Sequence, residues 1–307
     1  MSPPSRPAAA APLAERHVTL GDLDVAYLTP TDSPQEGPLA ICLHGFPDSA
    51  WTWRYLLPEL AAAGFRPVAP FLRGYAPTAV PADGLYQVGA LSKDAIDLRD
   101  ALGGDASSVI VGHDWGAMAT YGATGFEPDG WNRAVTLAVP PAGVVAAAFT
   151  SYDQLRRSWY MYFFQHPLAE HVVGQDDLHF IDRLWDEWSP GYPAAGDLAT
   201  TKAALRDPAN LAAALGYYRA TLGNGPKDDS LAGIEAAWTT SNPVPTLYLH
   251  GRADGCIGAE LVVDVEQYLP GEGSAVEVID GVGHFLHLEQ PGPITSRIVG
   301  FLQEGRT

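Results

Sequence analysis

The sequence predicts an α/β fold in which a mostly parallel central sheet is interrupted by a helical insertion. Short apolar runs alternate with helix-like segments as far as residue 140, this alternation stops over 141–228, and it resumes at 245. Continuous apolar runs are typical of strands buried on both faces of a parallel sheet. Alternating strands and helices then place the sheet between two layers of helices.

The first half of the predicted sheet begins with a hairpin. HVTL (17–20) and LDVAYL (23–28) flank Gly21 and Asp22, which is typical of two strands joined by a tight turn. PLAICLHG (38–45) predicts the next strand, which is apolar throughout. Further strands are expected over 66–70, 107–113 and 134–140, with helices over 51–63, 92–104 and 116–125.

The helical insertion and the end of the chain complete the predicted organisation. Residues 141–228 contain aromatic-rich, helix-like stretches with Pro and Gly breaks and no convincing strand. Strands are then expected over 245–251 and 274–280, with helices near 258–268 and 291–304. We therefore expect three parts, namely a tail over 1–16, an α/β core over 17–140 and 229–307, and a helical cap over 141–228.

Composition limits the function before any motif is considered. Acidic residues outnumber basic ones 36 to 18, giving a formal net charge of −18, and such a surface repels nucleic acid and anionic lipid. No apolar stretch approaches the roughly 18 residues of a membrane-spanning helix, and the proline-interrupted start does not resemble a signal peptide. Cys42 and Cys256 lie far apart in apolar surroundings, which predicts free thiols, no metal site and a cytoplasmic protein.

GHDWG (112–116) follows a predicted buried strand and opens a helix. Glycines on both sides of Asp114 permit a tight turn that exposes its side chain at the carboxyl end of the sheet. The N-terminus of the following helix favours a negative charge there. Taken alone, Asp114 could simply cap this helix, but two further features favour a catalytic role.

The first feature is the order of Asp114, Asp254 and His284 along the chain. Asp254 follows the strand over 245–251, and His284 follows the strand over 274–280. Nucleophile, acid and histidine in this order, each after a strand, are typical of α/β-hydrolases. We therefore expect these three residues to form a catalytic triad.

The second feature is HGFP (44–47), which lies at the end of the strand expected over 38–45. The backbone N–H group of Phe46, together with that of Trp115 after the expected nucleophile, could form an oxyanion hole. The alternative is an ordinary turn at the end of a strand. Its position after this strand favours the functional interpretation.

Together these motifs resemble the soluble epoxide hydrolases of the α/β-hydrolase superfamily. The similarity runs from about residue 38 to 295 through HGFPDSAWTWR, LRGYAPT, GHDWGA, GRAD and GHFLHLEQP, and LRGYAPT departs from the commoner RGYG pattern at Ala76. The resemblance implies that Asp114 opens an epoxide as a covalent nucleophile and that His284, assisted by Asp254, activates water. It also implies a small-molecule epoxide substrate, no cofactor, and a monomer or homodimer.

The resemblance further implies two cap tyrosines that hold and protonate the epoxide oxygen. SWYMYFFQHP resembles the first tyrosine segment and selects Tyr160, while GYYRA resembles the second and selects Tyr218. A neutral phenol suits this role because it donates a proton at pH 7. The neighbouring Tyr152, Tyr162 and Tyr217 remain alternatives, and aromatic packing is the competing explanation.

Two other functions remain open on the sequence alone. A haloalkane dehalogenase would use the same aspartate and would need N–H donors for the leaving halide. Trp115 fits one such donor, but Phe46 stands where one dehalogenase group has Asn, so Trp159, Trp185 or Trp188 would have to supply the second. A non-catalytic ligand receptor is the other alternative, because a fold does not fix a function.

Overall fold

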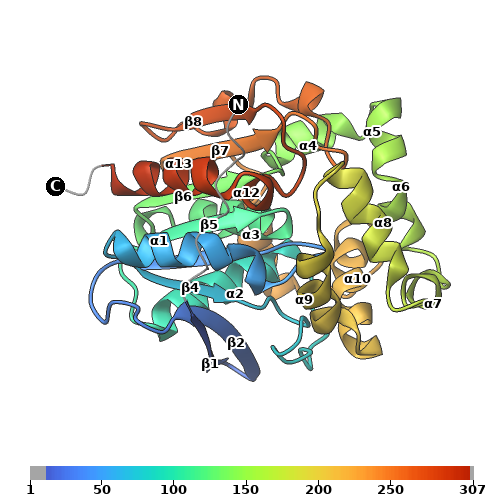
Figure 1. The fold of residues 1–307 in the computed structure, drawn as a ribbon, viewed down its shortest axis with the longest axis horizontal. Coiled ribbons are helices and arrows are strands. Elements are labelled where there is room, and N and C mark those ends of the chain that lie inside the picture. Colours follow the sequence, from blue (N-terminus) through green and yellow to red (C-terminus); the bar gives the residue numbers. More distant parts are fainter. Residues whose placement is uncertain (1–11, 305–307) are drawn as a thin grey trace.

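An eight-stranded sheet runs through the centre of the computed structural model, which describes residues 12–304 (Figure 1). Its strand order is β1-β2-β4-β3-β5-β6-β7-β8. β1 (Leu13–Leu20) and β2 (Leu23–Pro30) form an antiparallel hairpin, and β2 is also antiparallel to β4. All the other strand pairs are parallel, which confirms the predicted mostly parallel sheet.

The six strands that follow the hairpin are short and apolar, as expected for strands with helices on both faces. Five of them are almost completely buried, and β8 at the edge of the sheet is half-buried. These strands are β3 (Leu39–Leu43), β4 (Arg66–Pro70), β5 (Val109–His113), β6 (Arg133–Leu137), β7 (Thr246–Gly251) and β8 (Ala275–Ile279).

Two layers of helices cover the sheet. α1 (Leu56–Ala62) and α13 (Pro291–Gln303) pack together on one face. α2 (Val88–Ala101), α3 (Trp115–Phe126) and α11 (Ala232–Ala237) pack together on the other. The sheet is therefore buried between two layers of helices.

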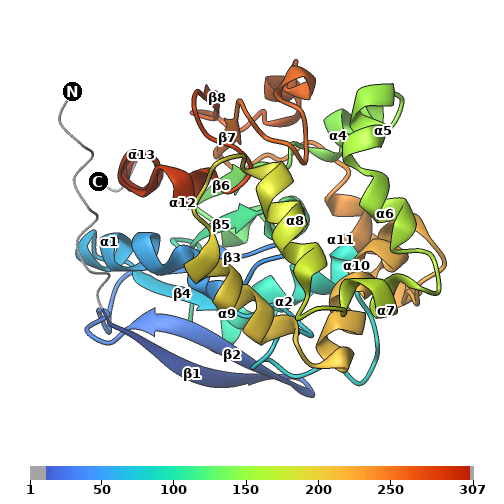
Figure 2. The ribbon, with the colours of Figure 1, turned by 45° about the vertical axis from the view of Figure 1, so that its right-hand side comes forward.

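The chain between β6 and β7 is helical apart from its connecting turns. Figures 1 and 2 show that α5 to α10 lie together at one side of the sheet. Trp185 of α8 ties this group to the core, because its indole N–H donates to Pro47 O, after β3, at 2.7 Å. The helices before α11 are α4 (Ala142–Ala148), α5 (Tyr152–Arg157), α6 (Trp159–Phe163), α7 (Ala169–Val173), α8 (His179–Trp188), α9 (Ala195–Leu205) and α10 (Pro208–Leu222).

The structure corrects two sequence-based boundaries. β1 begins at Leu13, so residues 13–16 of the expected tail are paired with β2, whereas residues 1–11 lie outside the described part. The helix expected near 258–268 is wrong, because that stretch forms only two 3-10 turns, η4 (Ala259–Leu261) and η5 (Val265–Tyr268). Asp264 between them adopts a left-handed conformation, with φ 54°, which a continuous α-helix excludes.

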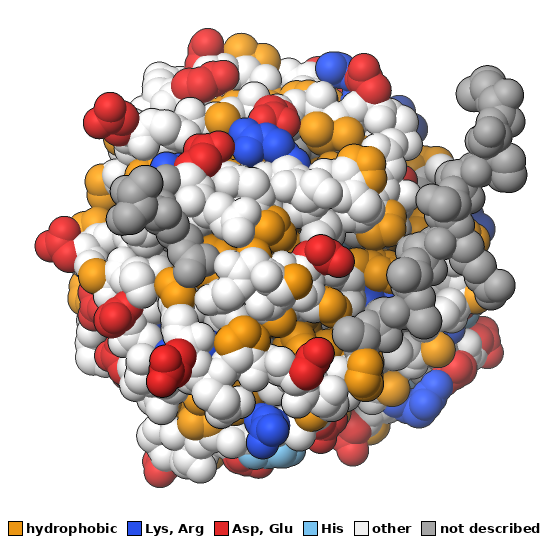
Figure 3. Space-filling model, turned by 60° about the vertical axis from the view of Figure 1, so that its left-hand side comes forward, with side chains coloured by type: hydrophobic (Ala, Val, Ile, Leu, Met, Phe, Trp, Pro, Cys, Tyr) orange, Lys and Arg blue, Asp and Glu red, His pale blue; other side chains and the backbone are white. Residues whose placement is uncertain are grey.

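The surface reflects the acidic composition. On the face shown in Figure 3, Asp and Glu side chains are scattered among uncharged ones rather than gathered over one element. Among the described residues, none of the helices is both long and apolar enough to span a bilayer.

Candidate active site

Asp114 lies at a sharp turn between β5 and α3. Its backbone has φ 54° and ψ −116°, an unusual conformation for a residue with a Cβ atom. Glycine is required on both sides, because a Cβ atom at Gly112 would collide with the carbonyl of Gly116, and one at Gly116 with the carbonyl of Leu43. The turn is therefore tight enough to hold the Asp114 side chain at the carboxyl end of the sheet.

The Asp114 carboxylate is buried but not isolated. The backbone N–H of Phe46 donates to Asp114 Oδ1 at 2.8 Å. Burial raises the pKa of Asp114 to about 6, although the charge of His284 and the backbone N–H groups of Phe46 and Trp115 lower it. The carboxyl group is thus mostly ionised at neutral pH, with two backbone donors directed at it.

His284 and Asp254 form a buried pair beside Asp114. His284 Nδ1 lies 2.9 Å from Asp254 Oδ2, which fixes the imidazole so that Nε2 faces Asp114. Nε2 is 3.9 Å from Asp114 Oδ2, too far for a direct hydrogen bond. Burial lowers the pKa of His284, but the charge and hydrogen bond of Asp254 outweigh this effect, so the pKa is raised above its ordinary value.

Tyr160 of α6 and Tyr218 of α10 line the same cavity as Asp114. Their rings pack edge to face with centroids 5.6 Å apart, and both side chains are buried. The Tyr218 hydroxyl has no hydrogen-bond partner within the described part of the chain. Burial raises the pKa of both phenols well above the ordinary value, so both keep their protons.

The three alternative tyrosines are directed elsewhere. Tyr152 is 75% exposed and Tyr162 is 50% exposed. Tyr217 is buried, but its hydroxyl donates to Arg73 O at 2.8 Å. The structure therefore brings Tyr160 and Tyr218, and none of these three, to the cavity with Asp114.

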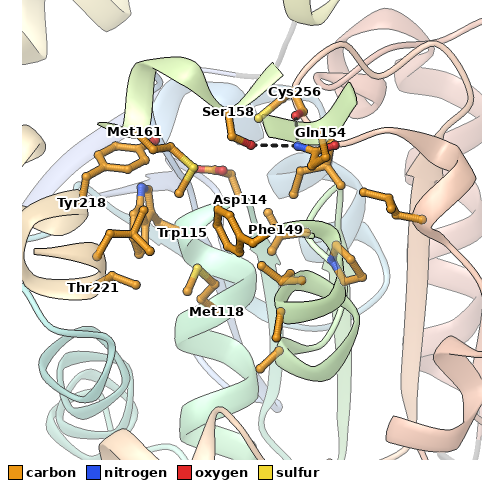
Figure 4. Close-up of a pocket in the computed structure, with 18 of the residues that line it drawn as sticks. Asp114, Trp115, Met118, Phe149, Gln154, Ser158, Met161, Tyr218, Thr221 and Cys256 are labelled. Carbon is orange, nitrogen blue, oxygen red and sulfur yellow. Dashed lines mark hydrogen bonds between the residues drawn. The ribbon is translucent and has the colours of Figure 1, made fainter. Parts of the chain in front are cut away.

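The cavity above Asp114 has a volume of about 240 Å³ and is mainly apolar (Figure 4). Met118 of α3, Phe149 and Met161 contribute to its walls, together with Leu222 and Trp238. No Lys or Arg lines it among the residues described. Such a site accepts an uncharged apolar molecule and leaves the few polar groups to orient it.

The comparisons with known proteins agree with this geometry. Residues 38–291 match the family model of the α/β-hydrolase fold. The chain belongs to the α/β-hydrolase family.

Its relatives include an "Epoxide hydrolase" of Caballeronia sordidicola, 29% identical over 300 residues, covering 87% of this chain and 88% of the relative. "Epoxide hydrolase A" of Mycobacterium tuberculosis is 28% identical and covers 86% and 90%. The solved structure of epoxide hydrolase A from Mycobacterium thermoresistibile superposes with a TM-score of 0.78 at 23% identity, covering 95% and 99%. The predicted resemblance to epoxide hydrolases is confirmed.

Three of the four tryptophans considered as halide donors are not arranged for that task. The cavity lining does not include Trp159, Trp185 or Trp188. The indole N–H of Trp185 already donates to Pro47 O, and Trp159 is 43% exposed. Trp188 instead packs against His284, with ring centroids 5.0 Å apart. Of the four tryptophans named in the sequence argument, only Trp115 reaches the cavity.

Two residues of the cavity lining, Gln154 and Cys256, were not identified as site residues from the sequence, and His113 and His287 were expected only to be structural. A second buried group near the site consists of Asp48, His113 and His287, with one carboxylate oxygen and two imidazole nitrogens that all lie within 4.8 Å of one another. Burial raises the pKa of Asp48 to about 8. Asp48 directly follows HGFP and His113 directly precedes Asp114, but only the folded chain brings His287 to them.

Proposed function

We propose that this protein is an epoxide hydrolase that converts an epoxide and water to a vicinal diol through an ester on Asp114. The observation that carries the proposal is one apolar cavity at which a buried carboxylate faces two protonated phenols. Relatives named as epoxide hydrolases support it. We further propose that residues 141–228 act as a cap, because they contribute both tyrosines.

In the first step, Asp114 attacks a carbon of the epoxide ring. The Phe46 N–H holds Oδ1, so Oδ2 is the oxygen better placed to act as the nucleophile. As the C–O bond of the ring breaks, Tyr160 and Tyr218 donate to the departing oxygen, and one of them supplies the proton. The product is a hydroxyalkyl ester of Asp114.

In the second step, His284 removes a proton from water, and the resulting hydroxide attacks the ester carbonyl carbon. The backbone N–H groups of Phe46 and Trp115 stabilise the oxyanion that forms. Asp254 stabilises the positive charge on His284, to which it is bonded at 2.9 Å. Collapse gives the diol alkoxide and a protonated Asp114 carboxyl group. One proton then goes to the diol oxygen and one to the phenolate, the first from His284 and the second from Asp114, which restores the starting enzyme. No cofactor takes part in either step.

The tyrosine pair favours this reaction over haloalkane dehalogenation. A departing epoxide oxygen needs a proton, whereas a departing halide needs only N–H donors, and Trp115 alone reaches the cavity among the candidates. Incubation with a styrene-type oxide should give the diol, and incubation with a haloalkane should release no halide. Halide release without diol formation would support the dehalogenase. Formation of neither diol nor halide would support a ligand receptor.

The ester intermediate has its own test. During a single turnover of the wild-type enzyme in heavy-oxygen water, the diol should receive unlabelled oxygen from Asp114, and the label should enter the enzyme. A labelled diol with an unlabelled Asp114 would show direct attack by water and overturn the covalent mechanism. The predicted cytoplasmic location and monomeric or homodimeric state remain predictions.

A further inference from the structure

Cys256 lines the cavity, but its thiol has no role in the proposed reaction. Its Sγ atom lies 3.4 Å from the hydroxyl oxygen of Tyr160, within the range of a hydrogen bond to sulfur in which either atom can be the donor. Its backbone N–H donates to Asp254 Oδ1 at 2.7 Å. One residue therefore contacts both the acid of the core and a tyrosine of the helical insertion.

We infer that Cys256 is a positioning residue for Tyr160, whose oxygen accepts a hydrogen bond from the thiol. A phenol has one proton and two lone pairs, and a thiol is a weak donor. When the thiol occupies a lone pair, the phenolic proton is left to point at the epoxide oxygen. The inference rests on the proposed function, because it requires Tyr160 to act on an epoxide.

The protonation state of Cys256 agrees with this role. Burial raises the pKa of the thiol well above its ordinary value, and the nearby Asp254 and Asp114 charges raise it further, although the hydrogen bond with Tyr160 lowers it. A protonated thiol is a donor and a poor nucleophile. Cys256 therefore does not compete with Asp114 for the epoxide, although both line the same cavity.

Gln154 of α5 holds this contact in place. Its amide nitrogen donates to Cys256 O at 2.8 Å and to Ser158 Oγ at 2.9 Å, and its amide oxygen accepts from Gly258 N–H at 3.0 Å. Ser158 immediately precedes α6, which carries Tyr160. The buried glutamine thus fixes the loop of the thiol relative to the helix of the phenol, and Figure 4 shows it beside Cys256.

The test is to measure ester formation and ester hydrolysis separately in single-turnover experiments. Cys256→Ala should slow ester formation roughly fivefold, the effect of one weak hydrogen bond, and leave ester hydrolysis unchanged. Cys256→Ser keeps a donor and should stay within about twofold of the wild type. Cys256→Val fills the space without a donor, so it should repeat the loss seen with Ala and replace that variant if Ala fails to fold.

Cys42 provides the matched control, because it is a fully buried thiol in β3 that does not line the cavity. Cys42→Ala should leave the rate of ester formation unchanged. In a Tyr160→Phe background, Cys256→Ala should have no further effect, since the hydroxyl that it positions is gone.

Two results would overturn the inference. One is an equal loss from Cys256→Ala in the presence and absence of the Tyr160 hydroxyl. The other is a wild-type rate of ester formation in both Cys256→Ala and Cys256→Val. A wild-type protein that forms no diol would instead overturn the proposed function.

Discussion

The two halves of the candidate active site are held by different forces. In the core half, Asp254 Oδ1 accepts backbone N–H groups of Cys256 and Ile257, and its Oδ2 is bonded to His284. In the helical half, the Tyr218 hydroxyl has no hydrogen-bond partner among the described residues, and the Tyr160 hydroxyl is bonded to the Cys256 thiol. The triad is therefore fixed by hydrogen bonds, and the phenols are fixed mainly by aromatic packing.

This difference follows the two steps of the proposed reaction. Ester hydrolysis needs an imidazole that is oriented before water arrives, and the buried Asp254 supplies that orientation. Epoxide opening needs hydroxyl groups that can donate to the epoxide oxygen. The Tyr218 ring is held by packing against Trp115, Phe46 and Phe164, and its hydroxyl has no hydrogen-bond partner among the described residues. Substitutions in the two halves should therefore impair different steps.

The largest expected effect belongs to Asp114, which serves both halves. Asp114→Ala should abolish diol formation, a loss of at least about 10⁴-fold, because no ester can form. The melting temperature and near-ultraviolet circular dichroism of the variant should show a folded protein. Diol formation at a near-normal rate by this folded variant would contradict the central role of Asp114.

The next largest effect should separate the core half from the helical half. His284→Gln should open the epoxide once and then stall, because no base remains to activate water. Intact-protein mass spectrometry should show a gain equal to the mass of the epoxide, mapped to the peptide that contains GHDWG. An absence of adduct, with the epoxide left intact, would place His284 in the first step.

Removing the Tyr160 and Tyr218 hydroxyls should give an intermediate loss of rate, confined to ester formation. Tyr160→Phe and Tyr218→Phe should each slow ester formation roughly 10²-fold, by analogy with the loss of an oxyanion donor. Tyr217→Phe is the matched control, because its hydroxyl donates to Arg73 O outside the cavity. Wild-type ester formation in the double variant would show that other groups protonate the epoxide oxygen.

The same comparison explains what the sequence could predict. Asp114, Asp254 and His284 each lie in the loop or turn after a strand. The carboxyl ends of parallel strands meet at one edge, so the proximity of the three residues followed from the order of elements. The choice of Tyr160 and Tyr218 depended on resemblance, because nothing in the sequence orients α6 and α10 over the sheet. Gln154 donates a hydrogen bond to Cys256 O, although the two residues are 102 positions apart in the sequence. No local sequence pattern indicates such a contact.

The two misplaced elements had local causes. Strand β1 extends back to Leu13 because β2 continues to Pro30 and offers a partner, although residues 13–16 themselves show little alternation. The expected helix near 258–268 contained apolar residues at plausible spacing, but the left-handed Asp264 interrupts it. The start of β1 was thus decided by its pairing with β2, and the absence of a helix near 258–268 by the backbone conformation of Asp264. The spacing of hydrophobic residues indicated neither.

A smaller effect than those of the Asp114, His284 and tyrosine substitutions is expected in the pH dependence of the two steps. Burial raises the pKa of Asp114 to about 6, and Asp114 attacks only as a carboxylate. Ester formation should therefore rise with pH through about 6 and be about tenfold slower near pH 5, where roughly one tenth of Asp114 is ionised. Burial also holds the pKa of Tyr160 and Tyr218 well above the ordinary value, so the rate should stay level at alkaline pH up to about 10.

Ester hydrolysis should lose its rate at a higher pH than ester formation does. It needs neutral His284, and although burial lowers the pKa of His284, Asp254 raises it above the ordinary value of 6.5. Rapid-quench measurements of both steps between about pH 4.5 and 9 would show the acidic pH range over which each step loses its rate. In His284→Gln, this range for ester formation should move to higher pH, because His284 lowers the pKa of Asp114. Two results would contradict these pKa assignments for Asp114 and His284. One is that both steps lose their rate at the same acidic pH in the wild type, and the other is that His284→Gln leaves the pH dependence of ester formation unchanged.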